Sequence, residues 1–93
     1  MKNWCKIIKL EDYDVIVLRL STTEEGEHVE LIARFPEGQF IKTASFEDNT
    51  EEADKFYKDY KKKNAQELVD ELIKLLEELN EIVTGKHVLL LLK

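Results

Sequence analysis

Apolar and polar residues alternate with the two-residue period of β-strands through most of the first half of the chain. We predict four strands, over residues 4–10, 15–20, 28–35 and 40–46. Short polar segments with the turn-forming residues Gly26, Pro36 and Gly38 separate the later strands. Strands joined by turns of this kind form an antiparallel meander.

The second predicted strand is apolar on both of its faces. Its two alternating sets are Ile16, Leu18 and Leu20, and Val15, Val17 and Arg19. Apolar residues on both faces are typical of a central strand. We expect the face with Arg19 to be half covered.

The second half of the chain has the spacing of amphipathic helices. Asn49 and the acidic residues after it are typical of a helix start, and the next apolar residues share one helix face: Ala53, Phe56, Tyr57 and Tyr60. We expect this helix to end in the lysines 61–63, which suit a helix C-terminus.

Asn64 with Glu67 three positions later is a capping-box pattern, which predicts a second helix from Ala65 to about Val83. Its apolar stripe is Leu68, Val69, Leu72, Ile73, Leu75, Leu76, Leu79, Ile82 and Val83. One long kinked helix is the alternative, because Tyr60, Asn64 and Leu68 continue a single row through the junction.

The run Val88–Leu92 is five apolar residues long and follows the turn signal Thr84-Gly85. It is too short to span a bilayer, which takes about 20 residues, and it is typical of a buried strand. We therefore predict an α+β fold in a single domain, residues 1–93. It has a four-stranded antiparallel meander, a C-terminal fifth strand, and two antiparallel helices on one face (ββββααβ).

Composition narrows the classes of function. The chain has 93 residues, a net charge of −6 and one cysteine, Cys5. A negative protein repels nucleic acid and anionic membranes, so we expect neither as a direct partner. A single cysteine forms no intrachain disulfide, and the N-terminus has no signal-peptide pattern. We expect a cytoplasmic protein.

Residues that could carry catalysis form no recognisable motif. His28 shares a strand face with Glu30, which predicts a surface pair, and His87 precedes the last predicted strand. Cys5 lies in an apolar strand without a histidine at a readable spacing, which predicts a buried structural thiol. Metal-binding and phosphate-binding patterns do not occur. We expect a protein that is not an enzyme and uses no metal or cofactor.

A basic island lies within this acidic chain. Residues 55–63 hold five lysines and one aspartate, a net charge of +4. Lysines among aromatic residues can hold a small anion such as a nucleotide. This alternative site consists of Lys58, Tyr60, Lys61, Lys62 and Lys63. The same residues also fit the end and the apolar stripe of a helix.

Acidic residues on the second helix, opposite its leucine stripe, are the main candidates for a binding surface: Glu67, Asp70, Glu71, Glu77, Glu78 and Glu81. Rows of carboxylates can mimic a nucleic-acid backbone and occupy a basic groove. We expect an interaction module that binds a basic surface of a larger partner. In size, acidity and lack of motifs the chain is similar in type to the inhibitors that phages make against bacterial defence systems. A third hypothesis is a structural protomer that self-associates through its last strand.

Overall fold

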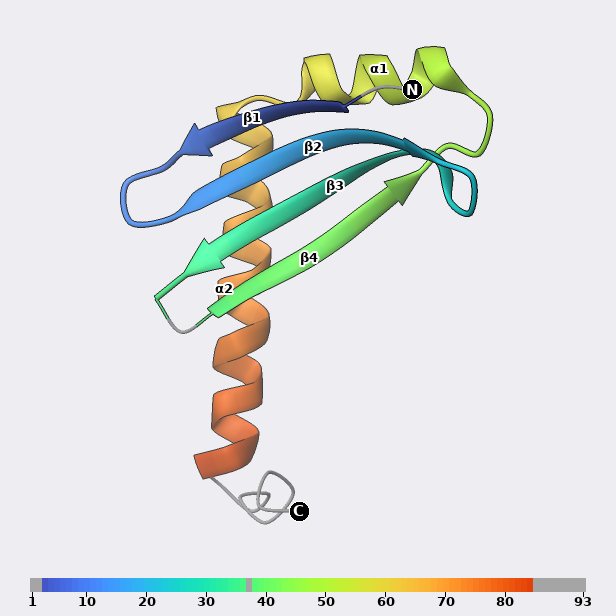
Figure 1. Cartoon of the computed structure of the whole chain (residues 1–93). Helices are drawn as coiled ribbons and strands as arrows, with labels where there is room; N and C mark the ends of the chain where they lie inside the picture. The colour runs from blue at the N-terminus through green and yellow to red at the C-terminus, as the bar shows by residue number, and fades with distance from the viewer. Residues whose placement is uncertain (1–2, 37, 85–93) are drawn as a thin grey trace.

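The computed structural model describes residues 3–36 and 38–84, with side chains up to residue 79. Four strands come first: β1 (Asn3–Lys9), β2 (Asp14–Thr22), β3 (Gly26–Phe35) and β4 (Gly38–Ser45). Two helices follow, α1 (Thr50–Asp59) and α2 (Lys62–Thr84). The strands form one antiparallel sheet in the order β1-β2-β3-β4 (Figure 1). The α+β class, the four strands and the meander are confirmed.

The core lies on the sheet face that carries Val15, Val17, Val29 and Ala33, all fully buried. Both helices contribute to it, α1 through Ala53 and α2 through residues such as Val69. The sheet and the two helices thus enclose a single hydrophobic core.

The structure corrects the expected roles of the two faces of β2. The face with Val15, Val17 and Arg19 is buried completely, whereas Ile16 is partly exposed on the opposite face. Arg19 can lie in the core because carboxylates from β3 and α1 pair with it. A buried charge is tolerated where such partners are present.

The opposite face of the sheet, which we call the open face, carries a row of isoleucines. The register aligns Ile7, Ile16, Ile32 and Ile41 across the four strands. At the two edges of the sheet Ile7 is 53% exposed and Ile41 57% exposed. Among the described residues the helices lie against the other face, so this row faces outward.

The structure also corrects the helix boundaries. Helix α1 ends at Asp59, and Tyr60 has an extended backbone while its N–H still bonds to Phe56 O and Tyr57 O. The lysines 61–63 therefore lie at the start of α2 instead of the end of α1. Asn64 Oδ1 accepts a hydrogen bond from Lys61 N at 2.9 Å, so Asn64 caps from inside the helix. The two helices are separate, and the single kinked helix is wrong.

The two helices do not lie antiparallel as expected. Figure 1 shows α1 along the β1 side of the sheet and α2 running from β1 towards β4 and beyond it. Ala65, Leu68 and Val69 of α2 are buried against the strands, whereas Leu75, Leu76 and Leu79 are 54%, 37% and 49% exposed. The apolar stripe of α2 thus continues past the part that the sheet covers.

Some expectations fall outside the described residues. These are the fifth strand at Val88–Leu92, the role of His87, and the side chain of Glu81, whose backbone belongs to α2. Within the described helices, none combines the length and the hydropathy that crossing a bilayer requires.

Candidate functional site

Two acidic turns that are far apart in sequence meet at one end of the sheet. The turn between β2 and β3 carries Glu24 and Glu25, and the segment after β4 carries Glu47 and Asp48. Glu27 N donates to Glu47 O at 2.7 Å, and Phe46 N donates to Glu27 O at 2.8 Å. These backbone hydrogen bonds hold the two turns against each other.

The close approach of the turns depends on Gly26. This glycine has a φ of 71°, and a Cβ atom placed there would lie 2.5 Å from Glu47 O. Glu47 itself has a φ of 54°, which is uncommon for a residue other than glycine. Both backbones therefore have conformations that the tight junction requires.

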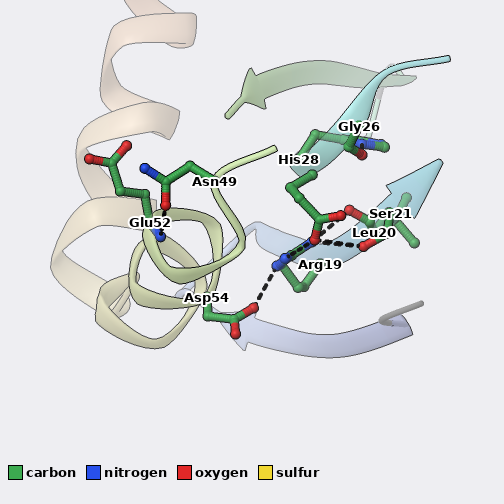
Figure 2. Close-up of polar contacts among 9 residues, drawn as sticks. Arg19, Leu20, Ser21, Gly26, His28, Asn49, Glu52 and Asp54 are labelled. Carbon is green, nitrogen blue, oxygen red and sulfur yellow. Dashed lines mark hydrogen bonds and ion pairs between the residues drawn. The ribbon is translucent and has the colours of Figure 1, made fainter. Parts of the chain in front are cut away.

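Helix α1 begins directly after this junction. Asn49 Oδ1 accepts a hydrogen bond from Glu52 N at 3.1 Å, which caps the helix as predicted (Figure 2). Glu51 and Glu52 lie in the first turn, where the helix dipole stabilises negative charge. The dipole thus allows two more carboxylates to gather at this end of the sheet.

Arg19 fixes the junction from inside the core. Its Nε donates to Asp54 Oδ1 of α1 at 2.9 Å, and its Nη2 donates to Glu27 Oε1 of β3 at 2.5 Å (Figure 2). Nη1 donates to Leu20 O at 2.6 Å. Ser21 Oγ also donates to Glu27 Oε1, at 2.8 Å. The two bonds that Glu27 accepts hold its pKa below the ordinary value of 4.5, and the bond from Arg19 has the larger effect.

The acidic turns line two adjoining shallow hollows, of about 650 and 490 Å³. Glu47 and Asp48 belong to both. We call their carboxylates the acidic end: Glu24, Glu25, Glu27, Glu47, Asp48, Glu51 and Glu52. Neither hollow has a lysine or arginine in its lining.

The acidic end is not arranged to chelate a metal ion. Among the described residues, no group of three or more histidine, cysteine or acidic side chains converges as metal binding requires. Its carboxylates are spread along two turns and the start of α1. Such a spread suits several cationic groups on an extended surface better than one small cation.

The acidic residues predicted on the second helix have the exposure that a contact surface needs. Glu67, Asp70, Glu71, Glu77 and Glu78 are all exposed on α2. They are not all equivalent, because Glu67 and Glu71 line a groove beside β4. Asp70 accepts a hydrogen bond from Gln66 Nε2 at 2.9 Å.

The structure does not gather the residues of the basic island into one anion-binding site. Tyr60 is 8% exposed, and its hydroxyl donates to Asn64 O at 3.3 Å. Lys58 Nζ lies 5.6 Å from the centre of the Trp4 ring, over β1. Lys61, Lys62 and Lys63 are exposed. None of the four lysines lines the two hollows of the acidic end or the two grooves beside Phe56.

Burial of Tyr60 predicts that the protein loses stability at alkaline pH. Burial raises the pKa of this phenol from 10.0 to about 12. The unfolded chain therefore releases the proton first, so the stabilisation is present below pH 10 and is lost as the pH rises towards 12. We expect denaturant titrations from pH 9 to pH 12 to show this loss. The Tyr60→Phe variant should show a smaller loss over the same range; an identical loss would mean that Tyr60 is not its source.

Two further sequence predictions need correction. His28 is on the face opposite the core as expected, but it is 1% exposed, and the carboxylate beside it is that of Glu25 rather than Glu30. Its Nδ1 lies 3.0 Å from Gly26 O, and its Nε2 lies 3.3 Å from Glu25 Oε2. Cys5 was expected to be buried, yet it is exposed because it alternates onto the open face next to Ile7.

The acidic end was not predicted as a unit from the sequence. The signal was present as two separate acidic clusters flanking β3 and β4. Only the pairing of these two strands, through residues 27 and 46, places the clusters side by side.

Comparison with protein-family models, with curated proteins and with solved structures gave no match to this chain.

Proposed function

We propose that this protein is a non-enzymatic interaction module whose acidic end binds a basic surface on a larger protein. The observation that carries the proposal is the junction of two acidic turns around hollows that lack basic side chains. Carboxylates gathered in this way create a negative potential that attracts and orients a positively charged partner.

The rigidity of the junction favours the acidic end over the acidic face of α2 as the binding surface. Backbone hydrogen bonds, a glycine with positive φ and the buried Arg19 hold the turns in place. A preorganised surface loses little conformational entropy on binding. The acidic face of α2, in contrast, is one side of a regular helix and is also expected of any solvated helix.

In type, the proposal corresponds to the small acidic inhibitors that phages direct against bacterial defence nucleases, acting in the cytoplasm. We also propose that Val88–Leu92 forms a fifth strand. An anion-binding role for the basic island is less well supported, because Tyr60 is buried and its lysines lie along separate surfaces.

Charge-neutralising variants test the proposal. Glu24→Gln, Glu47→Gln and Asp48→Asn together remove three charges from the acidic end, and Glu67→Gln, Glu77→Gln and Glu78→Gln remove three from α2. We expect the first variant to lose the protein that the wild type captures from lysate, and the second to retain it. Capture should also weaken with rising salt.

Circular dichroism should first show that both variants are folded. If the α2 variant loses the captured protein and the acidic-end variant keeps it, the helix face is the contact surface. Equal weakening of both variants would show that net charge alone governs capture, and would contradict a localised site.

A further inference from the structure

His28 is a buried histidine on the open face of the sheet. Although this face is exposed at both edges of the sheet, His28 itself is 1% exposed. Leu20 of β2 and Ser45 of β4 lie beside it in register. The turn between β2 and β3 supplies the polar partners of the ring. Nδ1 lies 3.0 Å from Gly26 O, and Nε2 lies 3.3 Å from Glu25 Oε2.

Both partners of the ring are hydrogen-bond acceptors. A backbone carbonyl and an ionised carboxylate accept hydrogen bonds and donate none. A neutral imidazole has one N–H group, whereas an imidazolium has two. The two contacts of His28 are therefore satisfied together only when the ring is protonated. In the neutral ring one nitrogen turns a lone pair towards an oxygen, and that contact is repulsive.

The side chain of Glu25 is the partner that can move. Its backbone is held in place, because its N–H donates to Thr22 Oγ1 at 3.0 Å and its carbonyl accepts from Ser45 Oγ at 3.5 Å. Its side chain, in contrast, is 58% exposed. The other partner, Gly26 O, is a main-chain atom of the same tight turn. We therefore expect a neutral ring to keep its N–H on Gly26 O and to release the Glu25 carboxylate.

Glu25 is the charged group that faces the ring in the described part of the chain. The neighbours from β2 and β4, Leu20 and Ser45, do not titrate near neutral pH. Along β3 the next residue on the open face is Glu30, and the preceding residue, Glu27, lies on the core face. Coupling to the proton on the ring therefore runs mainly through Glu25.

Glu25 also belongs to the acidic end. It lines the hollow of about 490 Å³ together with Glu24, Glu27, Glu47 and Asp48. A carboxylate that pairs with an imidazolium adds little to the negative potential of this surface, whereas a released carboxylate adds a full charge. Histidine is the side chain that ordinarily changes its charge between pH 5 and pH 8.

We propose that His28 is a pH-sensitive switch that sets the charge of the acidic end through Glu25. The protonated ring binds the Glu25 carboxylate, and the neutral ring releases it towards the hollow. This inference rests on the proposed function, because the released carboxylate strengthens a surface for a basic partner. Binding of such a partner should therefore strengthen as the pH rises from 6 to 8.

A nuclear magnetic resonance titration of the free chain tests the switch without a partner. His87→Gln in every sample leaves His28 as the one histidine of the sequence, so the ring signals are assigned. We expect the midpoint of the His28 titration to lie about half a pH unit lower after Glu25→Gln, because the carboxylate favours the charged ring.

Glu24→Gln is the matched control, since it removes the same charge from the same turn. Both glutamates are exposed, so both variants should stay folded. The control should move the midpoint much less than Glu25→Gln does. Equal midpoints in the two variants would show that Glu25 is not coupled to the ring, and would overturn the proposal.

An acetylated decalysine peptide with a fluorescent label tests the effect on binding, because its own charge stays constant between pH 6 and pH 8. At low salt we expect the chain with Glu25 to bind it about twofold or more tightly at pH 8 than at pH 6. Glu24→Gln should keep this ratio and Glu25→Gln should reduce it. The same ratio in both variants would contradict the switch.

The switch and the proposed function fail separately. If the peptide binds the Glu24→Gln, Glu47→Gln, Asp48→Asn variant as tightly as the wild type, the acidic end is not the binding surface. The resonance titration needs no partner, so it still decides whether the proton on His28 is coupled to Glu25.

Discussion

Replacing Arg19 with methionine is expected to lower the free energy of unfolding by about 3 kcal/mol. Removing one member of a buried ion pair costs about 3–5 kcal/mol, because the remaining charge stays desolvated. The lower end of the range applies because the partner side chains of Glu27 and Asp54 are 19% and 18% exposed, so water still reaches their carboxylates. Urea denaturation at neutral pH measures the difference. Methionine keeps most of the apolar stem, so the change reports mainly on the lost charge.

Arg34→Met is the matched control for this experiment. Arg34 donates two hydrogen bonds to Asp14 and holds the pKa of that carboxyl below its ordinary value, yet its side chain is 47% exposed. Exposed pairs contribute up to about 1 kcal/mol. Equal effects of the two substitutions would show that Arg19 does not act as a buried charge.

The effect of Arg19 should also depend on pH. The guanidinium lowers the pKa of Glu27, so the folded chain keeps that carboxylate ionised at a pH where the unfolded chain binds a proton. The stabilisation is therefore present above pH 4.5 and is lost as the pH falls below it. The difference between wild type and Arg19→Met should shrink in this acidic range. A constant difference down to low pH would contradict the ion pair with Glu27.

Replacing Gly26 with alanine is expected to cost about 2–3 kcal/mol. Backbone strain at a positive φ costs about 1–3 kcal/mol, and the new Cβ would also meet Glu47 O, a backbone atom that cannot rotate away. The melting temperature and urea midpoint measure the loss. Capture of a basic partner should fall as well, because the same contact holds the acidic turns together.

Gly26→Asn separates the two causes. Asparagine tolerates a left-handed backbone better than alanine, but it brings the same Cβ. We expect it to be nearly as destabilising as alanine. Stability close to that of the wild type would show that strain, and not the approach to Glu47, sets the cost.

The strands, their turns and the meander follow from local pattern, because alternation and turn residues act over a few positions. The buried face of β2 could not be predicted in the same way. Both of its faces are apolar, and the charge of Arg19 favours solvent until Asp54, which is 35 residues further along, is placed beside it. Long-range pairing of this kind leaves no local signal.

The predicted boundary between α1 and α2 was wrong for a related reason. Lysines suit the end of a helix through its dipole, which contributes about 0.3–1 kcal/mol for each charge. The extended backbone of Tyr60 and the cap from Asn64 to Lys61 outweigh it. The acidic end, likewise, follows from strand register rather than from either acidic cluster alone.

The single tryptophan gives this protein an internal optical reporter. Trp4 of β1 lies with its ring centre 5.5 Å from that of Tyr57 in α1, although 53 positions separate the two residues. Excitation energy passes efficiently from tyrosine to tryptophan over such a short distance. Emission from Trp4 thus reports when α1 detaches from β1. Far-ultraviolet circular dichroism follows the helices themselves, so the two signals together can distinguish undocking of α1 from its unfolding.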